Sequence, residues 1–306
     1  MWLALNALLP VFLLIGGGYL MHRTGFPGDD FWPAAERLTY YVLFPALLFS
    51  SLANASLNNA PVAPMAAAMS GGTLVLAVIT WTLRRQLATD GPGFSSVFQG
   101  AVRFNTYVAI TICFALYGDD GLALAAVAIA ILVPLVNVLS VTVLSRYGDS
   151  DKTGRDWPRA IRAIAKNPLV LACVLGLIVN AATVARPASI TGLLEILGRA
   201  ALPLGLLAVG AGLRIASVRS AGTVTLTASG LRLLLSPALA LAFCLVLGLS
   251  GAPALVVLIF AAAPGASSAY VLAGQLGGDR MLMASILTVQ TLLAAVTLPL
   301  LLLFAV

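Results

Sequence analysis

Charged side chains are scarce in this sequence. Asp, Glu, Lys and Arg make up 9% of the 306 residues, 60% of the residues are hydrophobic, and the mean hydropathy is +1.03. A water-soluble domain needs a largely polar surface, and about 25% of the residues of an average protein are charged. The composition therefore excludes a soluble globular domain and predicts that lipid surrounds much of the chain.

Residues suited to catalysis and metal binding are also few. The sequence has one histidine, His22, and three isolated cysteines, and it lacks H-E-x-x-H, G-x-x-x-x-G-K-[ST] and any clustered Cys/His motif. The segment GASSA at 265–269 resembles the nucleophile elbow G-x-S-x-G, but Ala269 replaces the last glycine and no nearby histidine could act as base. We predict no enzymatic activity, no metal and no cofactor. The missing phosphate-binding loop argues against ATP-driven transport by this chain alone.

Apolar runs predict an all-α integral membrane protein with ten spans, since about 20 apolar residues cross a bilayer as a helix. The predicted spans are 2–21, 33–53, 61–83, 96–116, 121–145, 167–184, 189–212, 221–248, 252–275 and 281–305. The first charges, His22 and Arg23, follow the first run, whereas a signal peptide carries positive charge before its apolar core. The first run is therefore expected to be a retained helix.

The placement of Lys and Arg predicts the orientation in the membrane. If the N-terminus is outside, the cytoplasmic loops hold twelve cations, and the opposite loops hold Arg186, with Arg199 near an interface. The positive-inside rule favours this arrangement, with both termini outside the cytoplasm and residues 145–166 inside. We expect a multi-pass protein of the cell (inner) membrane. The net charge of +6 is then explained without a nucleic-acid partner.

The sequence also repeats itself. Pro10 and Pro168 are 158 residues apart, and each is followed by a second proline 35 residues later. ALYGDDGLALAA at 115–126 matches GQLGGDRMLMAS at 274–285 at an offset of 159, which pairs Gly118 with Gly277. We therefore predict two homologous halves.

These halves are 1–145 and 167–306, joined by a cytoplasmic linker, 146–166. Each half holds five predicted spans, and because five is odd the second half must enter the membrane in the opposite sense. Inverted repeats are typical of secondary transporters, whose substrate site lies near the midplane between the repeats.

The stretch AAAPGASSAY, residues 261–270, interrupts the ninth span, and the offset of 159 places Pro264 opposite Asn105 in the fourth. Pro264 lacks an N–H, and Gly265 lets the backbone leave helical geometry. Such a break is tolerated in a membrane only where it faces protein or a water-filled cavity. We predict crossed, broken helices at spans four and nine, whose half-helix N-termini attract an anion without a fixed Lys or Arg.

Polar residues near these breaks are the candidate substrate ligands. Asn137 and Gln290 lie in apolar spans, where an unpaired amide is costly, although they could instead join helices. A simple proline kink, with serines bonded to their own helix, is the alternative for the ninth span. The predicted substrate-binding residues are Asn105, Thr106, Asn137, Pro264, Gly265, Ala266, Ser267, Ser268, Gln290, Ser50 and Ser51.

Charges within the spans are interpreted differently. Arg103 and Arg232 lie near cytoplasmic ends and are expected to extend to the membrane interface, with substrate attraction as the alternative. None of the eleven acidic residues falls at a clear midplane position. A proton relay or a carboxylate sodium site is therefore not predicted, and movement of an anion down its electrochemical gradient is the simplest mechanism.

In several motifs the sequence resembles the auxin efflux carrier family, which includes the plant PIN transporters and many bacterial relatives. The motifs are FPALLF at 44–49, RFN at 103–105, YGDDG at 117–121, VPLVNVLSV at 133–141, KNPLVLACVLG at 166–176, ALPLGLLAVGAGL at 201–213, PGASSAYVLAGQLGGD at 264–279 and TLP at 297–299. The resemblance covers nearly the whole chain. Relatives commonly carry Gly and Pro after the asparagine of the fourth span, whereas residues 106–111 have neither.

The resemblance implies ten spans in two inverted repeats, crossed helices at spans four and nine, and export of organic anions without ATP. It also implies a scaffold of the first, second, sixth and seventh spans, a homodimer through spans two and seven, and a mobile unit formed by the other spans. The predicted substrates are carboxylates, either auxin-like or dicarboxylates. The alternatives are a sodium- or proton-coupled anion symporter similar to the bile acid symporters, and a non-transporting membrane receptor.

Overall fold

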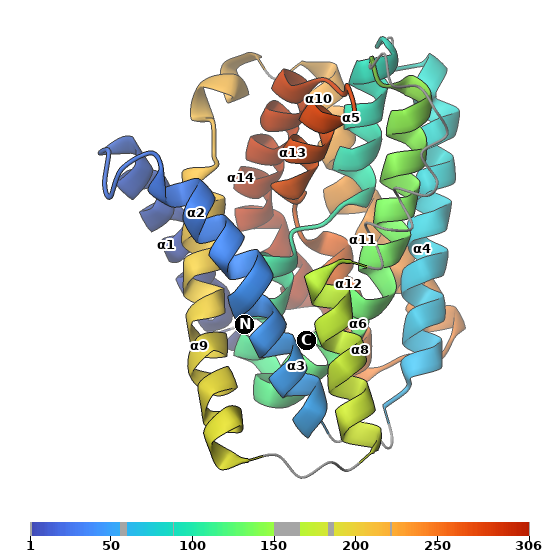
Figure 1. Cartoon of the computed structure of the whole chain (residues 1–306). Helices are drawn as coiled ribbons and strands as arrows, with labels where there is room; N and C mark the ends of the chain where they lie inside the picture. Colours follow the sequence, from blue (N-terminus) through green and yellow to red (C-terminus); the bar gives the residue numbers. More distant parts are fainter. Residues whose placement is uncertain are drawn as a thin grey trace. The chain divides into compact units, whose positions relative to one another are not determined.

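The computed structural model describes residues 2–55, 60–87, 89–149, 166–182, 187–220 and 222–305, and all regular structure in them is helical (Figure 1). The helices are α1 (Trp2–Arg23), α2 (Phe31–Leu38), η1 (Thr39–Leu43), α3 (Phe44–Asn54), α4 (Val62–Thr82), η2 (Leu83–Arg85), α5 (Gly91–Val102), α6 (Thr106–Tyr147), α8 (Pro168–Ala181), α9 (Ala188–Ala211), η3 (Ile215–Ser220), α10 (Thr223–Gly230), η4 (Leu231–Leu235), α11 (Ser236–Val246), α12 (Gly251–Ala262), α13 (Ser268–Gln275) and α14 (Arg280–Ala305). This confirms the predicted all-α class.

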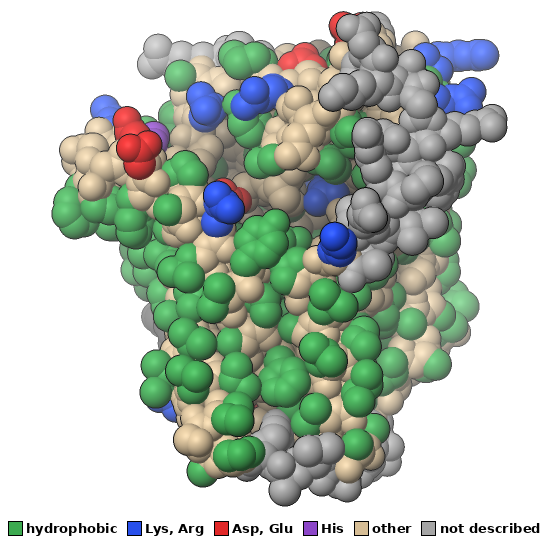
Figure 2. Space-filling model, in the orientation of Figure 1, with side chains coloured by type: hydrophobic (Ala, Val, Ile, Leu, Met, Phe, Trp, Pro, Cys, Tyr) green, Lys and Arg blue, Asp and Glu red, His purple; other side chains and the backbone are tan. Residues whose placement is uncertain are grey.

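Length and composition identify the membrane-spanning helices among the described residues. Five helical stretches are long and apolar enough to cross a bilayer, and three shorter apolar helices accompany them. Hydrophobic side chains cover much of the visible surface (Figure 2), and Ile196, Leu245 and Met281 are each more than two-thirds exposed. Such exposure suits contact with lipid and confirms an integral membrane protein.

Each predicted span contains helix, but the inverted ten-span repeat and its orientation stay predictions. Most of the linker 146–166, with Lys152 and Arg155, lies outside the described residues, as does Arg186. The paired glycines of the two halves both have a positive φ. Gly118 has a φ of 57° and Gly277 a φ of 74°, a left-handed region that glycine adopts without strain. Gly118 kinks α6 between the fourth and fifth predicted spans.

The chain forms two compact units. Unit 1 comprises Met1–Ala60, Tyr107–Ala130 and Ala165–Gly212, and unit 2 comprises Pro61–Thr106, Ile131–Ile164 and Leu213–Val306. Unit 1 therefore holds the first, second, sixth and seventh predicted spans. Both units draw on both predicted halves, so they are distinct from the repeats 1–145 and 167–306, which stay a prediction.

Unit 1 is held by close helix packing and by one asparagine. α3 packs against α8 and α9, and α1 packs against α9. The Asn180 side chain donates to the carbonyls of Leu52, Ala53 and Ala55 at 3.0, 3.3 and 2.8 Å. The last carbonyls of a helix have no partner within the helix, so Asn180 stabilises the end of α3.

Unit 2 contains α4, α5, the second part of α6, and α10–α14. Its buried apolar core includes Phe94 and Phe98 of α5, Ala269 and Ala273 of α13, and Ile286 of α14. A Cβ on Gly100 would lie 2.7 Å from the Ile286 side chain, so this glycine lets α5 approach α14 closely. The core fixes both broken helices against α14.

A π-helical turn precedes a proline in each of two spans. η1 lies just before Pro45, and η4 lies just before Pro237. Proline lacks the N–H for the helical hydrogen bond, and its ring crowds the carbonyl of the preceding turn. A wider turn relieves that crowding, so both helices continue through the proline. In unit 2 this turn carries Arg232.

Candidate functional site at two paired helix breaks

The fourth and ninth predicted spans are both interrupted, as the sequence predicts. α5 ends at Val102 and α6 begins at Thr106, while α12 ends at Ala262 and α13 begins at Ser268. The residue after each first half-helix is extended, with a ψ of 144° at Arg103 and 138° at Ala263. The fourth span is thus broken although residues 106–111, directly after Asn105, contain neither Gly nor Pro.

The two breaks meet within unit 2. The backbone N–H of Asn105 donates to the Pro264 carbonyl at 2.6 Å, and both residues are buried. The pair that the sequence offset aligns is therefore in direct contact. Each break supplies a partner for a backbone group that the other exposes, which an apolar environment requires.

Gln290 of α14 links the same two breaks. Its Oε1 accepts from the Gly265 N–H at 2.8 Å, and its Nε2 donates to the carbonyls of Gly100 at 2.9 Å and Ala228 at 3.3 Å. The side chain is fully buried. Because one amide carries two donors and an acceptor, protein groups engage both ends of Gln290. Here it positions the backbone, and its contact with substrate stays a prediction.

Gly265 is needed for space. A Cβ at this position would lie 2.7 Å from both Gln290 Oε1 and Leu287 Cδ2, and the sequence alone indicates only its conformational freedom. The Gly265 N–H reaches the Gln290 oxygen because no side chain stands between them. The link between the breaks therefore depends on this glycine.

Gly265→Ala is expected to destabilise the protein by about 1–3 kcal/mol, the usual cost of overpacking a buried site. Chemical unfolding of the detergent-purified protein measures this loss. Gly230→Ala is the matched control, because Gly230 ends α10 with helical angles and nothing lies within 4 Å of its Cβ position. Equal stability of the two variants would contradict the close approach at Gly265.

Arg103 brings a positive charge to the paired breaks. Its side chain is 9% exposed, its Nη1 donates to Asn137 Oδ1 at 2.8 Å, and its Nη2 donates to Ser268 Oγ at 3.0 Å. Two predicted site residues, from α6 and from the start of α13, thus converge on one guanidinium. Both acceptors are neutral, so they orient the guanidinium without cancelling its charge.

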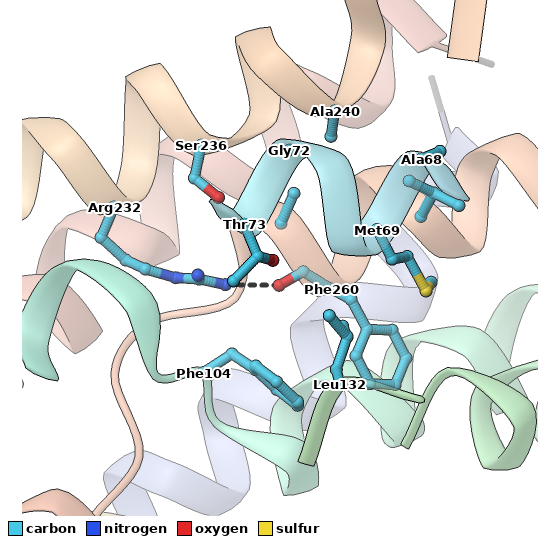
Figure 3. A pocket seen from close by; sticks show the side chains of 12 residues that line it. Ala68, Met69, Gly72, Thr73, Phe104, Leu132, Arg232, Ser236, Ala240 and Phe260 are labelled. Atoms are coloured by element: carbon cyan, nitrogen blue, oxygen red, sulfur yellow. Dashed lines mark hydrogen bonds between the residues drawn. The ribbon is translucent and has the colours of Figure 1, made fainter. Parts of the chain in front are cut away.

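Arg232 holds the end of the first half of the ninth span. Its Nε donates to the Ala263 carbonyl at 2.8 Å and its Nη2 to the Phe260 carbonyl, and Figure 3 shows the guanidinium pointing at Phe260 above the Phe104 ring. Among the described residues no carboxylate lies within salt-bridge distance of Arg232. A cation at a helix C-terminus is stabilised by the helix dipole. Arg232 therefore fixes α12 where the break begins.

A cleft in unit 2 lies beside this arginine. The cleft is small, with a cavity volume of about 20 Å³, and Figure 3 shows α4 residues such as Met69 and Thr73 facing Arg232, Phe104 and Phe260. Apolar side chains form most of its wall. The cleft adjoins both breaks through Phe104 and Phe260.

The structure corrects two predictions about the arginines. Arg103 and Arg232 bond to residues of the helix breaks and are nearly buried, so neither extends to the membrane interface. The site is also not free of a fixed cation, because Arg103 is part of it. Its place two residues before Asn105 is the sequence signal that could have identified it.

The remaining predicted site residues are placed as follows. Thr106 begins α6 directly after the first break, and Ala266 and Ser267 lie between Gly265 and α13. Ser50 and Ser51 belong to α3 in unit 1, and their role in the site stays a prediction. Within the described residues no three His, Cys, Asp or Glu side chains form a group that could hold a metal ion.

Comparison with known proteins agrees with these features. A family model described as a membrane transport protein matches residues 3–302. The chain is 28% identical over 302 residues to an uncharacterized transporter of Methanothermobacter thermautotrophicus, and the match covers 96% of each chain. The chain therefore belongs to this membrane transport family, the auxin efflux carrier family that its motifs resemble.

Proposed function

We propose that this protein exports small organic anions across the cell membrane by alternating access around the paired helix breaks. The observation that carries the proposal is the Arg103 guanidinium, which Asn137 and Ser268 hold beside the meeting point of the breaks. The expected substrates are carboxylates, either auxin-like or dicarboxylates.

The chemistry of Arg103 suits a carboxylate. A planar guanidinium presents paired donors that match the two carboxylate oxygens, and such charge-assisted bonds are the stronger ones. α13 begins at Ser268, so the partial positive charge of its N-terminus adds to the same attraction. A bound carboxylate would replace Asn137 or Ser268 as a partner of Arg103. Substrate binding would thus alter the hydrogen bonds that join α5, α6 and α13.

Export needs no ATP in this scheme. An inside-negative potential drives a monovalent anion outward with about 2.3 kcal/mol per 100 mV. The four spans that the family resemblance assigns to a fixed scaffold lie in unit 1, which also holds Tyr107–Ala130, and the breaks belong to unit 2. We propose that unit 2 moves with the substrate, that both termini lie outside the cytoplasm of the cell (inner) membrane, and that scaffold spans two and seven form a homodimer.

Flux into and out of proteoliposomes tests this function. With a panel of mono- and dicarboxylates and a potential imposed by potassium and valinomycin, we expect carboxylate to leave the negative compartment without sodium or ATP. Reversing the potential should reverse the flux. Strictly sodium-dependent flux would favour the symporter, and carboxylate binding without flux would favour the receptor; either result contradicts the proposal.

A further inference from the structure

Two buried polar side chains near Arg103 have no partner among the described residues. Gln99 of α5 is fully buried, and neither its Oε1 nor its Nε2 has a hydrogen-bond partner in the described part of the chain. Ser140 of α6 is also fully buried, and no described residue bonds its Oγ. Folded proteins leave few such groups unsatisfied, because the lost hydration is costly. A ligand that bonds both groups would remove this cost.

Gln99 lies on the face of α5 that carries Arg103. The Arg103 N–H donates to the Gln99 carbonyl at 2.8 Å, so this bond ends the last turn of α5 before the chain becomes extended at Arg103. Ser95, Gln99 and Arg103 are spaced by four residues and share one face, about 6 Å apart along the helix. Gln99 is therefore one helical turn from Arg103.

The facing side of α6 carries Asn137, Ser140 and Leu144 at spacings of three and four. The two faces meet at one end through the Arg103–Asn137 hydrogen bond of 2.8 Å. At the other end Ser95 Oγ and Leu144 Cδ2 both lie 3.1 Å from the Cβ position of Gly278.

The ring centroids of Phe94 in α5 and Tyr147 in α6, beyond that end, are 5.2 Å apart. α5 and α6 run antiparallel here, because residue numbers rise along α5 while those of the neighbouring α6 residues fall: 94 lies near 147, 95 near 144, and 103 near 137. Gln99 and Ser140 lie midway between these contacts, so the antiparallel register places them opposite each other between α5 and α6.

We propose that Gln99 and Ser140 form a second subsite, which binds a neutral hydroxyl of a carboxylate held by Arg103. The Gln99 oxygen requires a donor, while its NH₂ group requires an acceptor. A hydroxyl supplies both, whereas a second carboxylate supplies acceptors only. The spacing of one turn selects a hydroxyl a few bonds from the carboxylate. This inference rests on the proposed anion function and specifies the substrate as a small hydroxylated acid.

Calorimetric binding to the purified full-length protein tests the subsite with matched pairs of acids. The probes are lactate against propionate and 3-hydroxybutyrate against butyrate, which differ only by the hydroxyl. We expect the wild type to bind at least one hydroxylated acid about 10-fold more tightly than the matched acid that lacks the hydroxyl. The acid without the hydroxyl leaves the polar groups of Gln99 and Ser140 unpaired. Gln99→Leu should bring that affinity ratio close to one without lowering the resistance of the protein to unfolding. Ser140→Ala should lower the affinity ratio in part.

Gln86→Leu is the control, because Gln86 is exposed and outside the subsite, and it should keep the wild-type ratio. If Gln99→Leu fails to fold, Gln99→Met and Ser140→Ala decide the question. A wild-type ratio of one for both pairs, or an unchanged ratio in the Gln99 variants, would overturn the subsite. The anion function would still stand if Arg103→Gln weakens binding of both members of a pair. No binding of any of the four acids by the wild type would overturn the subsite, while the flux panel of mono- and dicarboxylates decides the anion function separately.

Discussion

Arg103→Gln is expected to abolish measurable carboxylate transport and to weaken carboxylate binding by at least 30-fold. Losing one partner of a buried charged pair costs roughly 2–5 kcal/mol, which corresponds to about 30-fold or more in affinity. Glutamine can still bond Asn137 or Ser268 but carries no charge. Binding and flux measured on the same preparation should therefore fall together while the protein stays folded.

Two further variants separate charge from position. Arg103→Lys keeps the charge but loses the paired donors, so an intermediate affinity is expected. Arg146→Gln removes an exposed arginine of unit 2 and should leave binding and flux at wild-type values. Wild-type affinity in a well-folded Arg103→Gln protein would refute the assignment of Arg103 to the substrate site.

Gln290→Leu is expected to lower the free energy of unfolding by roughly 2–5 kcal/mol, because each buried group left without a partner costs about 1–3 kcal/mol. The substitution removes the acceptor of the Gly265 N–H and the donor to the Gly100 carbonyl. Both groups lie at the breaks, where no helical bond replaces the loss. Chemical unfolding in detergent, followed by circular dichroism, measures the change.

Comparison with other glutamine variants identifies the cause. Gln290→Glu keeps the size and the acceptor for Gly265 but replaces the donor to the Gly100 and Ala228 carbonyls, so it should also destabilise. Gln275→Leu changes an exposed glutamine at the end of α13 and should have little effect. If Gln290→Leu unfolds at the same denaturant concentration as the wild type, Gln290 does not hold the two breaks together.

Local chemistry and internal repetition determined much of this protein from sequence alone. The apolar runs predict the helices, because a bilayer demands about 20 apolar residues for each span. Pro264 and Gly265 predict the break between α12 and α13, since proline removes a helical hydrogen bond. The offset of 159 residues aligns Asn105 with Pro264, and in the structure a 2.6 Å hydrogen bond joins them.

Only the tertiary structure decided which side chains complete the site. Arg103 bonds residues 34 and 165 positions away, and Gln290 reaches the Gly100 carbonyl 190 positions away. The place of Arg103 beside Asn105 points to the break, but no local pattern identifies Asn137 and Ser268 as its partners. The need for Gly265 likewise arises from α14, whose Gln290 occupies the space that a Cβ would fill. These properties depend on packing between distant helices, and helical periodicity and hydropathy do not encode the partners.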